Sequence, residues 1–372
     1  MIGYYVHHQG DGHLTRAAAI ARALGEEPVC GLSSRPRPDD WPGEWVQLAR
    51  DDEGPFEGAA AGGALHWAPR GHVGLRERMA QISAWVATHA PRRFVVDVSV
   101  EVTVLVRAMG VPTVVVALPG VRDDFAHQLG YRLADAIIAP WPDWADVLRG
   151  GEEWRAKTVA VGAISRFEGR AVVSAPKTRA VMVGGRGASA PTAPALAPPL
   201  PAAPAAAGAT VVPAETPAAA RDRTVLVLSG RGGTELTLDE LAAAQAETPG
   251  WTWIVLGPPG SRWVADPWPL LCAADVVVTH AGQNAVADVA AARRPAVIVP
   301  QPRPFDEQAT TARALEAAGL AVVQPVWPAG TWADTLERAV QMGGDGWERW
   351  SPPGAAIRAA TLIRDLTCAP RT

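Results

Sequence analysis

Cysteine is scarce in this sequence, and an excess of basic residues is missing. The three cysteines among 372 residues lie far apart, without a Cys-x-x-Cys pair. This spacing excludes zinc ribbons and dithiol redox sites, and so sparse a count is more typical of a reducing compartment than of a disulfide-linked protein. Lys and Arg number 34 against 38 Asp and Glu, a formal net charge of −4. Because proteins that bind nucleic acids usually present a basic face, we expect no nucleic-acid partner.

Long apolar runs are missing as well. No stretch approaches the about 18 uninterrupted apolar residues of a membrane-spanning helix. The first eight residues have the pattern of a strand rather than of a signal peptide, so we expect a cytoplasmic protein. Apolar residues nevertheless make up 48% of the chain, which is enough for one or more cores. The length corresponds to two domains, or three, at about 100–200 residues per domain.

The middle of the chain lacks the pattern of a folded element. Residues 188–220 contain 15 Ala and 8 Pro, with Glu215 as their one charged residue. Proline removes a backbone donor and clashes with the preceding turn, so a regular helix is not expected there. We predict a linker or disordered insert over residues 176–222. It would join an N-terminal domain of residues 1–175 to a C-terminal domain of residues 223–372 that ends in a helix.

On both sides of this segment, short apolar runs alternate with helical stretches. Strands are predicted over residues 2–7, 94–98, 113–118, 136–139 and 158–161, and again over 224–228, 251–256, 275–279 and 296–300. Helices are predicted over residues 14–24, 100–109, 284–293, 308–318 and 355–366, and Thr237 and Glu240 have the spacing of a capping box. This alternation predicts two doubly wound α/β domains with parallel sheets, and a cleft at the carboxyl ends of the strands.

The first candidate site is the turn Gly10-Asp-Gly12-His13 after the first strand. The glycines permit a tight turn, and His13 would begin a helix, whose dipole favours a neutral, proton-accepting imidazole. Asp97 stands at the end of another strand, where its carboxylate would fix the tautomer of His13 and raise its basicity. A surface histidine, and an aspartate that only caps the next helix, are the alternatives.

Two further turns are candidates for phosphate binding. The loop Ser229-Gly230-Arg231-Gly232 offers small residues and a charge, although it lacks the ending of a Walker A loop. The stronger candidate is the turn from His280 to Asn284, where the N–H groups of a starting helix suit a diphosphate. Asp288 lies one turn further on the same face and is placed to accept hydrogen bonds from a ribose diol. Plain turns and a solvated Asp288 are the alternatives.

A carboxylate and an amide stand side by side at Glu307 and Gln308, a pair that can hold sugar hydroxyls. With it, residues 263–308 resemble the nucleotide-sugar signature of GT-B glycosyltransferases, and are similar to the plant-type UDP-glycosyltransferase box and to the MurG type. The resemblance implies the GT-B fold, with two Rossmann-like domains facing a cleft. The implied catalytic residues are His13 as the base and Asp97 as its partner. The implied donor-binding residues are Gly12, Gly230, Arg231, Gly232, Trp263, His280, Gly282, Gln283, Asn284, Asp288, Glu307 and Gln308.

Several positions depart from the family pattern, so the donor sugar is not implied. Asp288 stands where Glu is usual, and Gln283 replaces the Trp of the plant type. The loop before Glu307 is longer, which makes Asp306 an alternative for its role. Ala312 occupies the position of an Asn in the MurG type.

The resemblance implies an inverting glycosyltransferase of the hexosyltransferase type, without a metal or other cofactor. The donor would be a UDP- or dTDP-sugar, and the acceptor a hydroxyl group of a small molecule, a lipid-linked compound or a glycan. Residues 51–78 are the best candidates for acceptor contacts. Adjacent His7 and His8 would point to opposite faces of a strand, which argues against a metal site with His13. A nucleotide-sugar hydrolase or epimerase, a non-catalytic binder, and peripheral membrane contact stay open.

Overall fold

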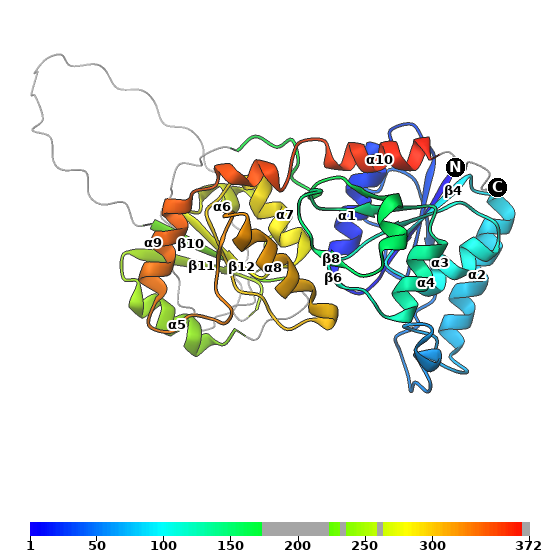
Figure 1. Ribbon diagram of the computed structural model, residues 1–372, viewed down its shortest axis with the longest axis horizontal. Helices are drawn as coiled ribbons and strands as arrows, with labels where there is room; N and C mark the ends of the chain where they lie inside the picture. The colour runs from blue at the N-terminus through cyan, green and yellow to red at the C-terminus, as the bar shows by residue number, and fades with distance from the viewer. Residues whose placement is uncertain (173–222, 231–235, 259–262, 367–372) are drawn as a thin grey trace, which may run out of the picture. The chain divides into compact units, whose positions relative to one another are not determined.

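The computed structural model describes residues 1–172, 223–230, 236–258 and 263–366 (Figure 1). The predicted linker, with the loop residues Arg231 and Gly232, lies outside the described residues. The chain divides into one compact unit of residues 1–175 and 223–372 and a second unit of residues 176–222. The first unit contains two lobes, called here the N-terminal lobe (residues 1–172) and the C-terminal lobe (residues 223–366).

The N-terminal lobe is built on a parallel sheet with the strand order β3-β2-β1-β4-β5-β7-β9. Its strands are β1 (Ile2–Val6), β2 (Val29–Ser33), β3 (Glu44–Gln47), β4 (Arg93–Asp97), β5 (Thr113–Val116), β7 (Ala136–Ala139) and β9 (Thr158–Ala160). Except for the edge strands, these segments are almost continuously apolar and buried, as expected of a parallel sheet covered on both faces. Two short strands, β6 (Gly120–Val121) and β8 (Leu148–Arg149), form a separate pair.

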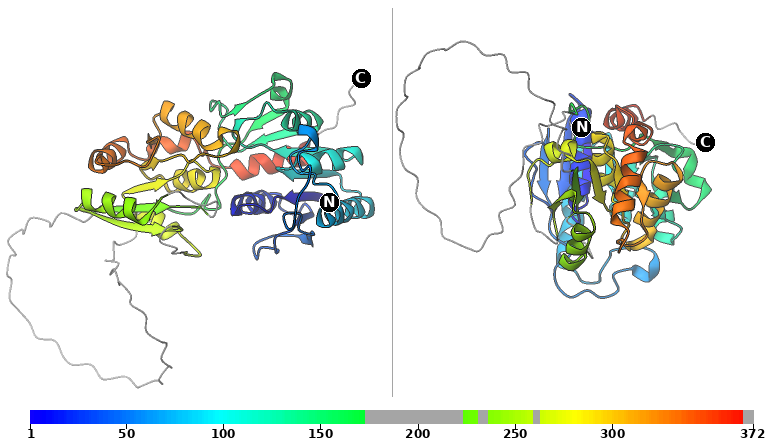
Figure 2. Two further views of the ribbon diagram at one scale, coloured as in Figure 1. Left: turned by 90° about the horizontal axis from the view of Figure 1, so that it is seen from below. Right: turned by 90° about the vertical axis from the view of Figure 1, so that its left-hand side faces the viewer.

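Helices cover both faces of this sheet, as the views in Figure 2 show. The helices of the lobe are α1 (Asp11–Ala23), α2 (Val73–His89), α3 (Val100–Ala108) and α4 (Phe125–Leu133), with 3-10 helices η1 (Ala61–Gly63) and η2 (Glu152–Lys157). Ser99 caps α3 and Asp124 caps α4, each by accepting a hydrogen bond from a backbone N–H of the first turn. The two caps fix where these helices begin, directly beside the ends of the strands.

The C-terminal lobe contains a parallel sheet with the order β11-β10-β12-β13-β14. Its strands are β10 (Arg223–Leu228), β11 (Trp251–Leu256), β12 (Val276–Thr279), β13 (Ala296–Ile298) and β14 (Val322–Val323). Its helices are α5 (Leu238–Glu247), α6 (Trp268–Ala273), α7 (Gln283–Ala292), α8 (Glu307–Ala317), α9 (Trp332–Met342) and α10 (Ala355–Asp365), with 3-10 helices η3 (Pro304–Asp306) and η4 (Asp345–Arg349). The predicted capping box of Thr237 and Glu240 begins α5.

The last helix, α10, packs on α1 of the N-terminal lobe (Figure 1). Ala355, Ala359, Ala360 and Ile363 are buried there in the same core as the alanines of α1. Small side chains let two helices approach closely. Although α10 is counted with the C-terminal lobe, its buried side chains therefore belong to a core of the N-terminal lobe. In the part of the chain that the structure describes, no helix is both long enough and apolar enough to cross a membrane.

The predicted α/β fold with parallel sheets is confirmed, and the predicted strands and helices agree with it to within a few residues. The strand predicted over residues 94–98 ends at Asp97, because Val98 has a positive φ of 59°. No element was predicted for β2, whose apolar run is interrupted by Gly31. A Cβ on Gly31 would lie 2.2 Å from the ring of Trp45, so the packing requires the glycine that breaks the pattern.

Candidate active site

Two adjoining cavities lie at the carboxyl ends of β1, β4 and β12. The smaller one has a volume of about 370 Å³ and the larger one about 630 Å³. Both lobes contribute to both cavities. His13 lines the two of them, together with Gly10, Leu118, Arg303, Glu307 and Gln308. His13 therefore lies at the boundary between the cavities.

The smaller cavity brings together the predicted donor residues that fall within the described part of the chain. These are Gly12, Gly230, Trp263, His280, Gly282, Gln283, Asn284, Asp288, Glu307 and Gln308. Arg231 and Gly232 lie outside the described residues. Residues spread over nearly 300 positions of the sequence thus share one concave site, which is what a common ligand requires.

At the boundary, His13 is hydrogen bonded to Asp97, as predicted. Nδ1 of His13 lies 3.0 Å from Oδ1 of Asp97, and Asp97 is completely buried at the end of β4. Because an ionised carboxylate can only accept, this contact, shorter than that of Nδ1 with Arg16, places a proton on Nδ1, and in the neutral ring the lone pair is then on Nε2. The imidazole is therefore held in the tautomer that a general base needs.

A buried arginine, Arg16, shares the same carboxylate. Its Nη2 lies 2.6 Å from Oδ1 of Asp97, and 3.3 Å from Nδ1 of His13. Burial alone would raise the pKa of Asp97, but the charges and hydrogen bonds of Arg16 and His13 outweigh it and lower the pKa. Asp97 is thus ionised at neutral pH. The residue that follows, Val98, has a φ of 59°, a strained conformation for a β-branched side chain.

Arg16 also connects the two lobes. Its Nη1 donates to Oε1 of Gln283 at 2.7 Å, at the first residue of α7. Within the described residues, Nε2 of Gln283 and Oγ of Ser229 are buried without a hydrogen-bond partner, and both residues line the smaller cavity.

Two glycines lie where the lobes approach each other closely. A Cβ on Gly12 would lie 2.0 Å from Nδ2 of Asn284, and a Cβ on Gly120 would lie 2.2 Å from the backbone oxygen of Phe305. A side chain at Gly12 would displace the amide of Asn284, whereas one at Gly120 would have to move the backbone of Phe305. The sequence indicated a tight turn at Gly12, but it held no sign of which residue would lie opposite.

The N-terminus of α7 forms one wall of the smaller cavity. Gly282 is the N-cap residue of this helix and has no side chain that could accept hydrogen bonds from the N–H groups of the first turn. Nδ1 of His280 bonds the backbone oxygen of Val299 at 2.9 Å, which fixes the orientation of the ring. The helix dipole gives this wall a positive potential suited to phosphate.

The side chain of Asp288 is almost completely buried. Oδ1 accepts a hydrogen bond from Oγ of Ser165 at 2.7 Å, and Oδ2 lies 3.3 Å from Nε of Arg166. Burial raises the pKa of Asp288 to about 6, although Arg166 and Ser165 act in the opposite direction. Neither Ser165 nor Arg166 was predicted, because both lie more than 100 positions from Asp288 in the sequence.

The remaining predicted pair, Glu307 and Gln308, begins α8. Glu307 lines both cavities and lies 3.5 Å from Nη2 of Arg122, which comes from the other lobe. Oε1 of Gln308 accepts from the backbone N–H of Gln301 at 2.9 Å. Asp306 is exposed and has a φ of 53°. The geometry therefore favours Glu307 over Asp306 as the carboxylate that faces a ligand.

The larger cavity is lined by apolar and polar side chains in about equal number. Asp51, His66, Trp67, Leu75 and Arg78 line it, all from the segment expected to provide acceptor contacts. The other walls come from the ends of β4 and β5, from α3 and α4, and from the loop before α8. The sequence analysis did not identify the contribution of α4, since nothing local marks its residues as facing a cavity.

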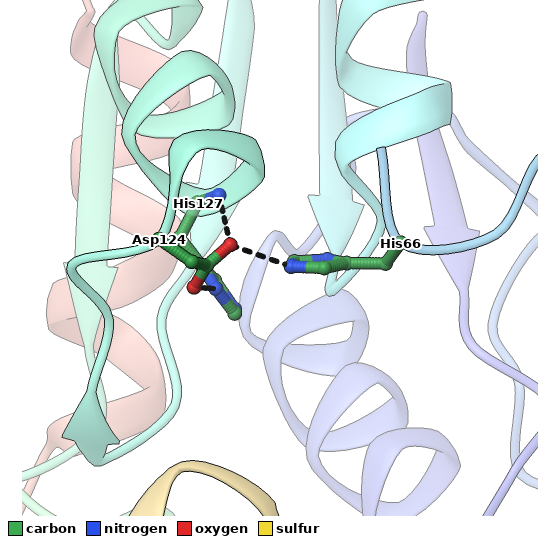
Figure 3. Close-up of side chains that lie close together, drawn as sticks. All are labelled: His66, Asp124 and His127. Carbon is green, nitrogen blue, oxygen red and sulfur yellow. Dashed lines mark hydrogen bonds and ion pairs between the residues drawn. The ribbon is translucent and has the colours of Figure 1, made fainter. Parts of the chain in front are cut away.

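One polar cluster of this wall consists of His66, Asp124 and His127 (Figure 3). Nε2 of His66 lies 2.9 Å from Oδ1 of Asp124, and Nδ1 of His127 lies 2.5 Å from Oδ2 of the same residue. Nη1 of Arg122 lies 3.2 Å from Nε2 of His127. Because arginine can only donate, His127 carries its proton on Nδ1, and this nitrogen has no lone pair for a metal.

A second cluster, His8, Asp51 and Asp52, contains metal-ligating side chains as well. Nε2 of His8 lies 3.6 Å from Asp51 and 3.4 Å from Asp52, but Arg78 and Arg50 already pair with these carboxylates at 2.8 Å. The expectation that His7 and His8 point to opposite faces was wrong. Both follow the last residue of β1, and their ring centroids are 5.1 Å apart.

Comparison with known proteins finds similarity to one family model and to solved structures. Residues 268–329 match the family model of the glycosyltransferase family 28 C-terminal domain. MurG from Acinetobacter baumannii is similar over 98% of both chains, with 14% identity and a TM-score of 0.55. The kitacinnamycin glycotransferase is similar over 98% of both chains, with 16% identity and a TM-score of 0.59.

The chain has the GT-B fold. A further GT-B structure, the spinosyn rhamnosyltransferase SpnG complexed with thymidine diphosphate, is similar over 98% of this chain and 100% of its own, with 15% identity and a TM-score of 0.55. A sequence search of curated proteins finds no match. The predicted GT-B fold and the predicted resemblance to glycosyltransferases are confirmed by these comparisons. The family match, residues 268–329, contains α7, α8 and most of the residues that the C-terminal lobe contributes to the smaller cavity.

Proposed function

We propose that this GT-B protein transfers a sugar from a UDP- or dTDP-sugar to a hydroxyl group of an acceptor, with inversion at the anomeric carbon. The position of His13 at the boundary of two cavities carries the proposal. A base placed there reaches both a donor in the smaller cavity and an acceptor in the larger one. The glycosyltransferase family 28 match and the thymidine diphosphate found in SpnG support this class of donor.

The smaller cavity would hold the nucleotide. The diphosphate would lie at the first turn of α7, where the backbone N–H groups and the helix dipole stabilise its negative charge. Trp263, half-exposed at the rim, would stack on the base, and Asp288 would accept hydrogen bonds from the ribose diol. Glu307 and Gln308 would contact the sugar, because they line both cavities.

The reaction would be a single displacement. Nε2 of His13 takes the proton of the acceptor hydroxyl. At the same time the oxygen of this hydroxyl attacks the anomeric carbon from the face opposite the diphosphate. The new bond from carbon to oxygen forms as the bond to the phosphate oxygen breaks, and the nucleoside diphosphate leaves with the electron pair. Asp97 stabilises the resulting imidazolium, which returns its proton to solvent.

We propose that this transfer needs no cofactor, since the terminus of α7 supplies the positive potential that stabilises the departing diphosphate. The partners would then be the nucleotide sugar and a hydroxyl acceptor. Small molecules, lipid-linked compounds and glycans all offer such hydroxyls. A cytoplasmic location and peripheral membrane contact stay predictions.

The size of the larger cavity favours transfer over the alternative of nucleotide-sugar hydrolysis. A hydrolase needs room for one water molecule beside its base, whereas about 630 Å³ adjoins His13 here. This volume lies within the range of small-molecule sites. A non-catalytic binding protein, in turn, would not need a buried carboxylate that fixes the tautomer of His13.

The test is the release of UDP or dTDP from a panel of nucleotide sugars, with and without acceptor mixtures, for the wild-type protein and His13→Ala. We expect release that depends on an acceptor and on His13. Release that is equally fast without an acceptor would establish the hydrolase. Nucleotide binding without turnover of any donor would establish the binder.

A further inference from the structure

The cluster His66, Asp124 and His127 is not used by the proposed transfer, yet its two histidines line the same larger cavity as His13. Its three side chains come from the loop after η1, from the cap of α4 and from the first turn of α4. Figure 3 shows the ring of His66 directed at Asp124 from the side opposite α4. The cluster therefore joins two segments of the cavity wall that are distant in sequence.

The charge and the proton positions in this cluster follow from Arg122. Since Arg122 donates to Nε2 of His127, the proton of His127 is on Nδ1 and is donated to Asp124. Burial, together with Arg122, lowers the pKa of His127 to about 4, so this ring is neutral at pH 7. Partial burial would raise the pKa of Asp124, but hydrogen bonds from His127 and His66 outweigh it and lower the pKa to about 2.

An ionised Asp124 determines what His66 can offer to a ligand. Oδ1 of Asp124 accepts a hydrogen bond from Nε2–H of His66, so in the neutral ring the lone pair is on Nδ1. The backbone N–H groups of His66 and Trp67 both donate to Oε1 of Glu101 at 2.8 Å, which holds this part of the loop in place. The side chain of His66 is one-third exposed and lines the cavity. With Nε2 held by Asp124, Nδ1 is the ring nitrogen of His66 that is left to contact a ligand.

The surroundings define the kind of ligand. Arg78 pairs with Asp51 at 2.8 Å and Arg122 lies 3.5 Å from Oε2 of Glu307, so the charges of these two arginines are compensated within the wall. Much of the remaining wall is apolar: Leu75, Met79, Val98, Val100, Val115 and Tyr131. Such a cavity suits an uncharged molecule with an apolar skeleton and a small number of hydrogen-bond donors.

We propose that His66, held by Asp124, is a recognition site for a second hydroxyl group of the acceptor, distinct from the hydroxyl that His13 deprotonates. The acceptor would then be an uncharged compound with an apolar skeleton and at least two hydroxyl groups. This inference rests on the proposed function for the role of His13, but the binding of a dihydroxylated compound does not itself require turnover.

The test uses 2-naphthol and the dihydroxynaphthalene isomers as probes, because they share one apolar skeleton and differ in the second hydroxyl and its position. Fluorescence titration gives their dissociation constants. We expect at least one diol to bind the wild-type protein about 2- to 12-fold more tightly than 2-naphthol, the gain typical of one hydrogen bond. His66→Phe should remove this preference, and His89→Phe, at an exposed histidine of α2 outside the cavity, should keep it.

Two results would overturn the proposal: no diol binds the wild-type protein more tightly than 2-naphthol, or the preference persists in His66→Phe. The exposure of His66 makes loss of folding in this variant a minor concern, and circular dichroism checks it. The nucleotide-release assay separates the two proposals. A preference that depends on His66, without transfer from any donor, keeps the site and contradicts the transferase. Transfer that is insensitive to His66→Phe, with no diol preference, keeps the transferase and contradicts the recognition site.

Discussion

The two cavities that meet at His13 are assembled in different ways. The smaller one is formed largely by two strand-to-helix turns, at the starts of α1 and α7, whose residues are close neighbours in sequence. The larger one collects residues from β1, α2, α3, β5, α4 and the loops between them. A site on a helix terminus is therefore recognisable from local spacing, whereas a site assembled from many segments depends on the whole fold. The predictions below test this division, from the largest expected effect to the smallest.

The largest effect is expected at the boundary itself. His13→Ala should lower turnover by roughly 10²–10⁴-fold, the usual contribution of a general base. The affinity for UDP or dTDP should barely change, because α7 rather than His13 would hold the diphosphate. Asp97→Asn should cost less, and the double variant should resemble His13→Ala, since Asp97 acts through His13. Losses that multiply in the double variant would give Asp97 an independent role.

The next effect concerns Arg16, which connects the two sides of the boundary. Arg16→Met leaves Asp97 buried with only His13 as partner, and removal of one member of a buried pair costs about 3–5 kcal/mol of stability. Guanidinium unfolding measures this loss. Arg22→Met is the matched control on the same helix, since its exposed pair with Asp40 should contribute below about 1 kcal/mol.

The pH dependence of this loss has a definite sign. The pKa of Asp97 is lowered in the folded protein, so its ion pair stabilises the fold above the unfolded pKa of about 3.9. That contribution disappears as the pH falls through the lower, folded pKa. The difference in stability between the wild type and Arg16→Met should therefore shrink in acid. A difference that stays constant down to pH 2 would mean that Arg16 stabilises by packing alone.

A smaller effect, confined to the smaller cavity, is expected at Asp288. Its pKa of about 6 means that the carboxylate ionises between about pH 5 and 7. Nucleotide affinity should rise over this range, by up to about 1.5–3 kcal/mol, because hydrogen bonds from the ribose to a charged acceptor are the stronger ones. Calorimetry compares the wild type with Asp288→Asn, which corrects for the titration of the diphosphate. Parallel pH profiles would remove Asp288 from the nucleotide site.

Stability should change in the opposite direction at Asp288. A raised folded pKa means that its contribution is fully present below the unfolded pKa and is lost as the pH rises through about 6. The wild type should therefore lose stability relative to Asp288→Asn between about pH 4 and 6. Thermal unfolding of both proteins across this range measures the difference.

The smallest effect is expected at Val98, on the side of the larger cavity. A non-glycine residue at a φ of 59° carries strain of about 1–3 kcal/mol. Val98→Gly relieves this strain and loses part of a half-buried side chain, so stability should change by no more than about 1 kcal/mol. The same change at buried Val96, in the regular part of β4, should destabilise far more strongly. Equal losses at both positions would show that Val98 is not strained.

The sequence allowed the fold to be predicted because both parallel sheets have nearly continuous apolar strands that alternate with helices. It also allowed the contact of His13 with Asp97 to be predicted, since Asp97 ends one strand and His13 begins the helix after another strand of the same parallel sheet. Arg16 lies three residues after His13 on α1, but its double contact depends on how α7 approaches α1. The pairing of Asp288 with Ser165, and of Arg122 with Glu307, likewise depends on tertiary structure and has no local signal.

A crystal structure with dTDP or UDP bound tests the central claim most directly, namely that the nucleotide and the acceptor lie on opposite sides of His13. We predict the diphosphate at the first turn of α7, within hydrogen-bond distance of backbone N–H groups of Gln283, Asn284 or Ala285. The ribose should lie beside Asp288, and the larger cavity should stay accessible from His13. A nucleotide bound in the larger cavity, among residues such as Met79 and Tyr131, would contradict the account.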